Sequence, residues 1–291
     1  MIRNFSKNRV VLILIISILV LTVVSCGQKQ EKPKEEETKD KIPQELKSMS
    51  EDSEKIIEEV EKLQEEVDKP LKYEDESKNK EENKEGSKEE GQQKQEKEEM
   101  SEEEKNKEKI LMKEEKIYKM WESIASKIES IHGGFNDYQA KALEAGATEE
   151  DINKLKKALD ELTLAVDKKD DKLSLEKLNQ MNFYMARFFD FYKGNIDAEI
   201  LRIKYYTREV HLDGMMNKWN EAEKNIEEIT PIYERLDQKV KLEEKDKPLM
   251  DKLKFAIDDL GDSIKYKSEK LLKIKRDIIL KNLDSIKDAT K

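Results

Sequence analysis

The stretch TEEDINKLKKALDELTLAV, residues 148–166, decides the fold class. Its largest apolar residues recur at alternating steps of three and four, at Ile152, Leu155, Leu159, Leu162 and Val166. This spacing keeps the side chains on one face of an α-helix. Thr148, followed three residues later by Asp151, marks the start of the helix. The stretch therefore predicts an amphipathic helix that buries one face against other helices.

The same spacing continues on both sides of this helix. Further apolar stripes occupy residues 110–131, 173–192, 196–240 and 248–278. We expect the first to end at Gly133-Gly134, and we expect Pro231 to bend or break the third near Thr230, because proline lacks an N–H and clashes with the preceding turn. At Gly194-Asn195 the chain either ends one helix and starts the next or continues with a kink.

The composition favours helices over sheets. Charged residues make up 43% of the 291 residues and hydrophobic residues 36%, with only nine Gly and five Pro. Glycine and proline are too few for a turn-rich β-sandwich, and no segment shows a sustained alternation of polar and apolar residues. We predict an all-α fold in which residues 110–291 form an elongated antiparallel helical bundle of about five helices.

Residues 1–25 have the layout of an export signal. Three basic residues precede an apolar run from Val10 to Val24, which is shorter than the roughly 20 residues that a stable membrane-spanning helix needs. The chain's single cysteine, Cys26, follows immediately. A single cysteine excludes an intramolecular disulfide and a zinc–cysteine cluster.

The sequence Val23-Val24-Ser25-Cys26 resembles the lipobox of bacterial lipoproteins, in which the invariant cysteine receives acyl chains and becomes the mature N-terminus. Cys26 matches that position and Ser25 is a tolerated small residue, whereas Val23 and Val24 depart from the consensus as the looser boxes of spirochaetes do. The resemblance implies palmitate or another acyl chain on Cys26. The alternative is an uncleaved anchor helix, and both make the membrane a partner of the protein.

Residues 26–109 are predicted to form an acidic, low-complexity, disordered tether. Gly27–Lys109 carries a net charge of −11 and offers few apolar side chains to pack. One apolar island interrupts it at residues 44–68, where apolar residues follow a heptad spacing. This island predicts a short helix that forms a marginal coiled coil, docks elsewhere or is only transient. Ser101 and Glu104 have the spacing of a capping box, which predicts that the first helix of the folded region begins here.

The residues of common catalytic and cofactor motifs are missing. The two histidines, His132 and His211, have no second His or Cys at ligand spacing, and the chain has no glycine-rich phosphate loop and no nucleophile elbow. We therefore expect no catalytic residues, no metal, no cofactor and no enzymatic activity. An acidic tether in front of a nearly neutral domain also argues against nucleic acid as a partner. A small-ligand carrier with a pocket between helices remains as an alternative.

Two patches are candidates for binding another protein. In the aromatic run 182–192, Phe183 falls nearly opposite the apolar face, so it is either covered by another helix or exposed to a partner. The second candidate contains residue types that are frequent in interface hot spots: Arg202, Tyr205, Tyr206 and Arg208. The alternative for this segment is a solvated helix face with tyrosines extending from the core.

The whole layout resembles the plasmid-encoded surface lipoproteins of Borrelia spirochaetes, which are helical, are displayed on the outer membrane and often bind host proteins. The resemblance implies a lipoprotein that faces the cell exterior and binds a host complement regulator, matrix protein or other host factor, or acts as an antigen. The alternative is a periplasm-facing scaffolding lipoprotein that self-associates weakly through helices, with residues 44–68 as the expected contact.

Overall fold

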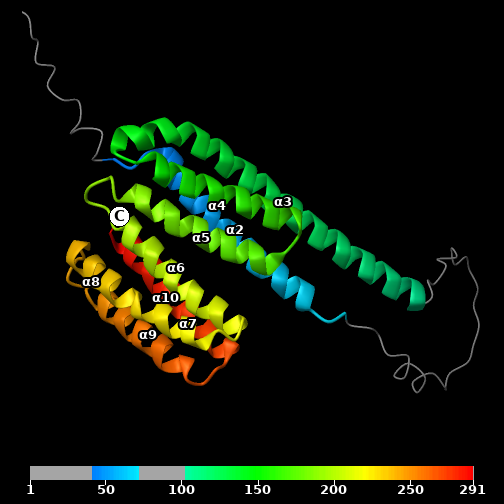
Figure 1. Ribbon diagram of the computed structural model, residues 1–291. Helices are drawn as coiled ribbons and strands as arrows, with labels where there is room; N and C mark the ends of the chain where they lie inside the picture. The colour runs from blue at the N-terminus through cyan, green and yellow to red at the C-terminus, as the bar shows by residue number, and fades with distance from the viewer. Residues whose placement is uncertain (1–40, 72–101, 291) are drawn as a thin grey trace, which may run out of the picture. The chain divides into compact units, whose positions relative to one another are not determined.

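Helices form where the apolar stripes predict them. Figure 1 shows the computed structural model, which describes residues 41–71 and 102–290. Within these ranges the secondary structure is helical and contains no strand, which confirms the all-α prediction. The helices are α2 (Gln44–Asp68), α3 (Glu102–Ala145), α4 (Glu149–Asp167), α5 (Asp171–Phe189), α6 (Asp197–Met215), α7 (Trp219–Glu227), α8 (Ile229–Lys239), α9 (Pro248–Ile264) and α10 (Glu269–Ala289).

Several expectations fall outside the described residues. These are the export signal at residues 1–25, the acyl site Cys26, the parts of the expected tether at residues 27–40 and 72–101, and Ser101 of the first expected capping box.

Helix α4 begins as its sequence predicts. The Thr148 hydroxyl accepts a hydrogen bond from the Asp151 backbone N–H at 3.1 Å, and the Asp151 carboxylate accepts one from the Thr148 N–H at 3.0 Å. This reciprocal capping box satisfies two N–H groups that a helix start leaves without partners. The buried face then carries Ile152, Leu155 and Leu159, as the stripe requires.

Helix α2 is part of the bundle and packs against α3 and α5. The apolar residues of its heptad stripe are at most 2% exposed from Leu46 to Leu63, and they join the same core as α3, α4 and α5. Of the three outcomes left open for residues 44–68, docking onto other helices is the one observed. The folded region therefore includes a segment that composition had assigned to the tether.

Helix α3 runs through Gly133-Gly134, so the expected helix end at this position is wrong. Beyond the glycines, Phe135 and Tyr138 extend the buried face of the helix, and this burial outweighs the poor helix propensity of glycine. At Gly134 the absence of a side chain lets α2 approach closely, because a Cβ there would lie 3.1 Å from Met49 Cγ.

The chain breaks at Gly194-Asn195 rather than kinking. Gly194 has φ +75°, a conformation that glycine adopts easily. Asn195 then links the two helices, because its side-chain amide donates to the carbonyls of Phe189 and Tyr192 and its Oδ1 accepts from the Asp197 N–H at 3.2 Å.

The stripe at residues 196–240 is divided into α6, α7 and α8. The division between α7 and α8 lies at Glu228, close to the break expected near Thr230. The division after α6 was not expected. There Asn217 adopts φ +58°, which asparagine tolerates better than most residues.

The stripe at residues 248–278 is also divided, which the apolar spacing did not predict. Lys267 has φ +48°, and the Ser268 hydroxyl caps α10 by accepting from the Leu271 N–H at 3.3 Å. This break turns the second half of the segment, so Ile274 and Ile278, expected in the core, are more than 40% exposed. The buried face carries other residues instead: Leu272, Arg276, Ile279, Leu283 and Ile286.

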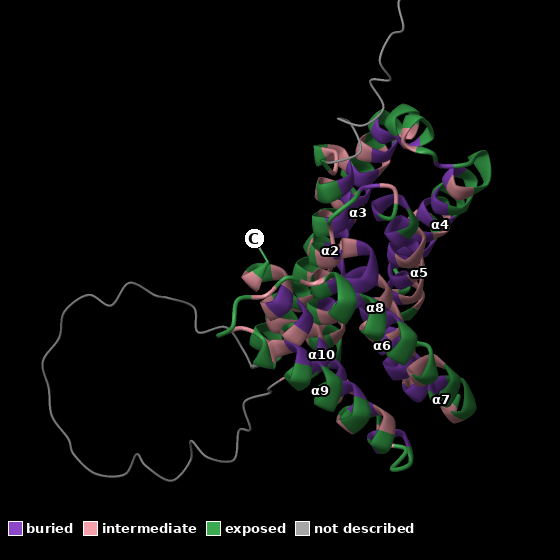
Figure 2. Cartoon of the chain, turned by 90° about the vertical axis from the view of Figure 1, so that its left-hand side faces the viewer, coloured by how far each residue is buried: buried purple, intermediate pink, exposed green. Residues whose placement is uncertain are grey.

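The apolar core forms two clusters that share α6. One cluster joins α2, α3, α4 and α5, and the other lies among α6 to α10. Leu201 belongs to the first cluster and Ile203 to the second, so α6 is covered on opposite sides. Buried residues line the surfaces where helices face each other and exposed residues cover the outer sides (Figure 2). The contact of α2 with α5 and α6 is partly polar, and it contains the ion pairs described below.

Candidate functional site

Helices α5 and α6 bring four aromatic rings together, which we call the aromatic cluster: Phe183, Tyr184, Tyr205 and Tyr206. The centroid of the Phe183 ring lies 4.5 Å from that of Tyr205 and 6.0 Å from that of Tyr206. The two tyrosine rings of α6 are 4.9 Å apart and nearly perpendicular. These separations are in the range of favourable aromatic contacts.

All four rings are half-buried. Phe183 is therefore neither fully covered nor free, since α6 supports one side of its ring while part of it remains in contact with solvent. The structure thus unites three of the residues singled out in the sequence, Phe183, Tyr205 and Tyr206, although Phe183 lies more than twenty positions before the two tyrosines in the chain.

Arg202 lies one turn before these tyrosines on α6. Its guanidinium forms a two-pronged ion pair with Asp190, with a distance of 3.0 Å between Nη1 and Oδ1. Because its charge is already paired and the side chain is mainly buried, Arg202 fixes the start of α6 against the end of α5.

Arg208 does not belong to this surface, which corrects its place among the candidates. Its side chain is only 8% exposed and makes hydrogen bonds of 2.8 and 2.7 Å to the two carboxylate oxygens of Glu54 on α2. The sequence spacing placed it near Tyr205, but α6 is covered on both sides, and Arg208 lies on the side that faces α2.

Glu54 is the centre of a buried ion-pair network. Lys204 donates to it at 2.9 Å and the Asn182 amide at 3.2 Å, and Lys204 also pairs with Asp284 of α10. Burial alone would raise the pKa of Glu54, but Arg208 and Lys204 outweigh burial and hold that pKa well below its usual range. The network joins α2 to α5, α6 and α10.

A second buried group lies between α6 and α10. The Arg276 guanidinium lies 3.1 Å from Nδ1 of His211 and 2.7 Å from the Glu61 carboxylate of α2. Burial and, to a smaller extent, the neighbouring Arg276 together lower the pKa of His211 to about 3, so the imidazole is neutral near pH 7. The other histidine, His132, is hydrogen-bonded to Thr163 at 2.9 Å.

A carboxyl group that titrates near neutral pH lies next to the aromatic cluster. The Asn179 amide donates to Glu209 at 2.7 Å and to the backbone carbonyl of Tyr205 at 3.0 Å. Burial raises the pKa of Glu209 to about 7, with a further contribution from the nearby carboxylate of Asp213. Protonation of Glu209 therefore changes the charge beside Tyr205 in the physiological range.

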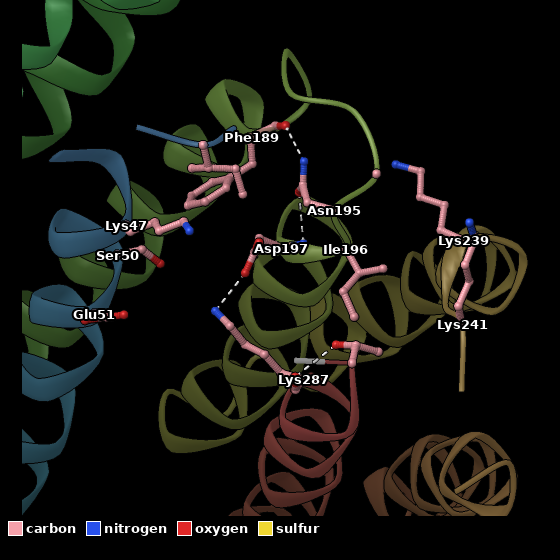
Figure 3. A pocket seen from close by; sticks show the side chains of 13 residues that line it. Lys47, Ser50, Glu51, Phe189, Asn195, Ile196, Asp197, Lys239, Lys241 and Lys287 are labelled. Carbon is pink, nitrogen blue, oxygen red and sulfur yellow. Dashed lines mark hydrogen bonds and ion pairs between the residues drawn. The ribbon is translucent and has the colours of Figure 1, made fainter. Parts of the chain in front are cut away.

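Sequence reasoning missed a pocket of about 430 Å³ that we call the lysine pocket, after Lys47, Lys239, Lys241 and Lys287 (Figure 3). These residues come from α2, the end of α8 and the segment after it, and α10, so no local spacing relates them. Among residues 41–71 and 102–290, no group of three or more His, Cys, Asp or Glu residues is arranged to hold a metal ion.

No helix in the part of the chain that the structure describes is long and apolar enough to cross a membrane. No protein-family model, curated protein or solved structure matches the chain.

Proposed function

We propose that this chain is a non-enzymatic lipoprotein that is anchored through Cys26 to the outer membrane, faces the cell exterior and binds a host protein. The supporting observation is the aromatic cluster, in which rings from two helices form one half-exposed surface. Aromatic side chains are enriched in protein interfaces because each provides a large contact area at a small cost in conformational entropy.

The position of α2 sets how far this module extends from the membrane. If Cys26 is the acylated N-terminus, seventeen residues lie between it and Gln44, where α2 begins. A fully extended chain spans at most about 3.5 Å per residue, so the bundle begins within about 60 Å of the lipid surface. The acidic residues 72–101 then join α2 to α3 within the module and do not lengthen the tether.

The binding test compares two pairs of substitutions in the full, acylated chain. One variant removes rings of the aromatic cluster, Phe183→Ala with Tyr206→Ala. The control removes rings from α9 and the segment after it, Phe255→Ala with Tyr266→Ala, where the residues are 69% and 66% exposed. We expect a serum protein retained by the unchanged chain and by the control to bind the cluster variant about tenfold more weakly or worse, a loss typical of hot-spot residues. Equal retention by all three proteins, or no retained protein, contradicts the proposal.

Display on the cell surface needs a separate experiment. Intact cells are treated with a protease, with a known surface protein as the positive control and a periplasmic protein as the negative control. Loss of the bundle from intact cells supports display. Survival of the bundle while the surface control is cleaved contradicts it.

The alternative, a scaffold that self-associates through residues 44–68, loses its expected contact surface. Leu46, Ile56 and Leu63 already bury their side chains in the bundle. Self-association through this stripe would therefore require α2 to leave the bundle and break its ion pairs with α6.

A further inference from the structure

The lysine pocket lies where four parts of the bundle meet. Its walls are the start of α2, the connection between α5 and α6, the segment at and after the end of α8, and the end of α10 (Figure 3). Phe189 and Ile196 are among the lining residues that give it apolar surface. Its volume of about 430 Å³ is in the range of small-molecule sites.

The charge of the lining residues is opposite to that of the chain. The whole chain has a formal net charge of −10, but four lysines and only two carboxylates line this pocket. Lys287 is paired with the lining residue Asp197 at 2.7 Å, and Lys239 with Glu199 at 2.7 Å. Among the described residues, Lys47 and Lys241 have no carboxylate within ion-pair distance, so two ammonium groups are available to a ligand.

The start of α6 adds positive potential to the same wall. The lining residues Gly194, Asn195, Ile196 and Asp197 lead into its first turn. Ile196 occupies the N-cap position, and its apolar side chain cannot accept a hydrogen bond from the N–H groups of the first turn. The Asp197 N–H donates instead to Oδ1 of Asn195. The partial positive charge of a helix N-terminus therefore reinforces the lysines.

The chemistry of the donors favours a tetrahedral oxyanion. No arginine lines the pocket, so its positive charge comes from lysine ammonium groups and the helix N-terminus rather than from a planar two-pronged guanidinium. Lysine ammonium groups act as point charges that approach a phosphate from different directions. We propose that the lysine pocket binds a phosphate group, carried either by an anionic phospholipid headgroup or by a soluble phosphate ester.

This inference does not depend on the proposed host-protein binding. Lipid phosphate becomes a close source if Cys26 is acylated, since Ile42, which precedes α2, is itself a lining residue. Soluble phosphate does not require an anchor. The experiment therefore offers both sources to the same protein.

Lysine acetylation of the full chain, read by mass spectrometry, tests occupancy. The probes are inorganic phosphate, glycerol phosphate, phosphatidylglycerol vesicles and phosphatidylcholine vesicles, each compared with sodium chloride at equal ionic strength. At a probe concentration of about four times its dissociation constant, we expect acetylation of Lys47 and Lys241 to slow about fivefold. Lys254 and Lys270, exposed lysines of α9 and α10, serve as internal controls and should change little.

The outcomes separate the two sources. Protection by inorganic phosphate or glycerol phosphate identifies a soluble ligand, and protection only by phosphatidylglycerol vesicles identifies a lipid headgroup. Protection of Lys254 and Lys270 to the same extent as the pocket lysines, or no protection by any probe, overturns the proposal.

Two variants test the electrostatic argument. Lys47→Gln with Lys241→Gln should weaken binding of the protecting probe about tenfold or more, whereas the control Lys254→Gln with Lys270→Gln should change it less than about twofold. Glu51→Gln removes an exposed carboxylate from the wall and should tighten binding about threefold. Because loss of folding cannot produce tighter binding, unchanged or weaker binding by Glu51→Gln contradicts the phosphate assignment.

Discussion

Arg208 on α6 and Glu54 on α2 are joined by two parallel hydrogen bonds of 2.8 and 2.7 Å, although 154 positions separate them in the chain. A two-pronged contact of this kind holds two helices in one register, because both oxygens and both nitrogens must align. Together with Lys204, the pair makes α2 an integral helix of the bundle.

We predict that Glu54→Gln destabilises the protein by about 3 kcal/mol, because it leaves the buried Arg208 without its carboxylate and leaves Lys204 with Asp284 alone. The matched control is Lys55→Gln, an exposed residue of α2 whose surface ion pair with Asp52 is screened by solvent, so this change should leave the free energy of unfolding nearly unchanged. Urea unfolding followed by circular dichroism measures both. Equal stability of the two variants would show that the network does not hold α2 in place.

The sequence could indicate that residues 44–68 form a helix but could not indicate its partner. The heptad spacing of Leu46 to Leu63 is the same for a coiled coil and for a helix packed on α3 and α5. The deciding contacts are charged groups on α2 and α6, and in a chain with 43% charged residues such pairs have no recognisable spacing. Arg208 was therefore interpreted as a surface residue.

Glu209 should make stability depend on pH between 5 and 8. The pKa of Glu209 in the folded chain, about 7, lies above the ordinary value of 4.5. Its contribution to the free energy of unfolding is therefore fully present below pH 4.5 and is lost as pH rises through 7. We expect the free energy of unfolding to fall by about 2 kcal/mol from pH 5 to pH 8 through this group. Relative to the unchanged chain, Glu209→Gln should therefore gain about this much free energy of unfolding between pH 5 and pH 8, as measured by urea unfolding at both pH values. A variant with the same pH dependence as the unchanged chain would disprove the assignment.

His211 should act in the opposite direction. The pKa of His211 in the folded chain, about 3, lies below the ordinary value of 6.5. Its contribution to the free energy of unfolding is therefore present above pH 6.5 and is lost as pH falls toward 3. Between pH 7 and pH 5 this loss is about 2 kcal/mol.

Because Glu209 and His211 oppose each other, the unchanged chain should show a flat profile between pH 5 and pH 7. Glu209→Gln should unmask destabilisation by acid, and His211→Gln should unmask stabilisation by acid. Two variants with parallel profiles would contradict this pair of assignments.

The fold class and most helix positions follow from local spacing, whereas the breaks depend on single residues. Thr148 and Asp151 were sufficient to place the start of α4. At Asn217 and Lys267 the backbone turns into the left-handed region although the apolar spacing runs on. At Gly133-Gly134 the opposite happens: the glycines predict a helix end, but α3 continues because burial of Phe135 stabilises the helix beyond them. At Gly133-Gly134, therefore, long-range packing outweighed local helix propensity.

Two glycines inside helices should respond to alanine with opposite signs. A Cβ at Gly133 in α3 meets nothing within 4 Å, so Gly133→Ala should stabilise the protein by about 0.5–1 kcal/mol through helix propensity and a less flexible unfolded chain. A Cβ at Gly214 in α6 would collide with Cδ1 of Leu272, which is fully buried, and would lie 3.4 Å from the Trp219 ring.

Gly214→Ala should therefore cost about 1–3 kcal/mol despite the gain in helix propensity, because the fully buried Leu272 must shift within a close-packed core. Thermal unfolding of the two variants beside the unchanged chain measures both effects. Leu272→Ala removes a buried side chain and is itself destabilising, but it should cost less in the Gly214→Ala background than in the unchanged chain, since it also removes the atom that collides. Stabilisation by both alanine substitutions at glycine, or strictly additive losses in the Gly214→Ala, Leu272→Ala double variant, would show that α6 and α10 do not pack as closely as described.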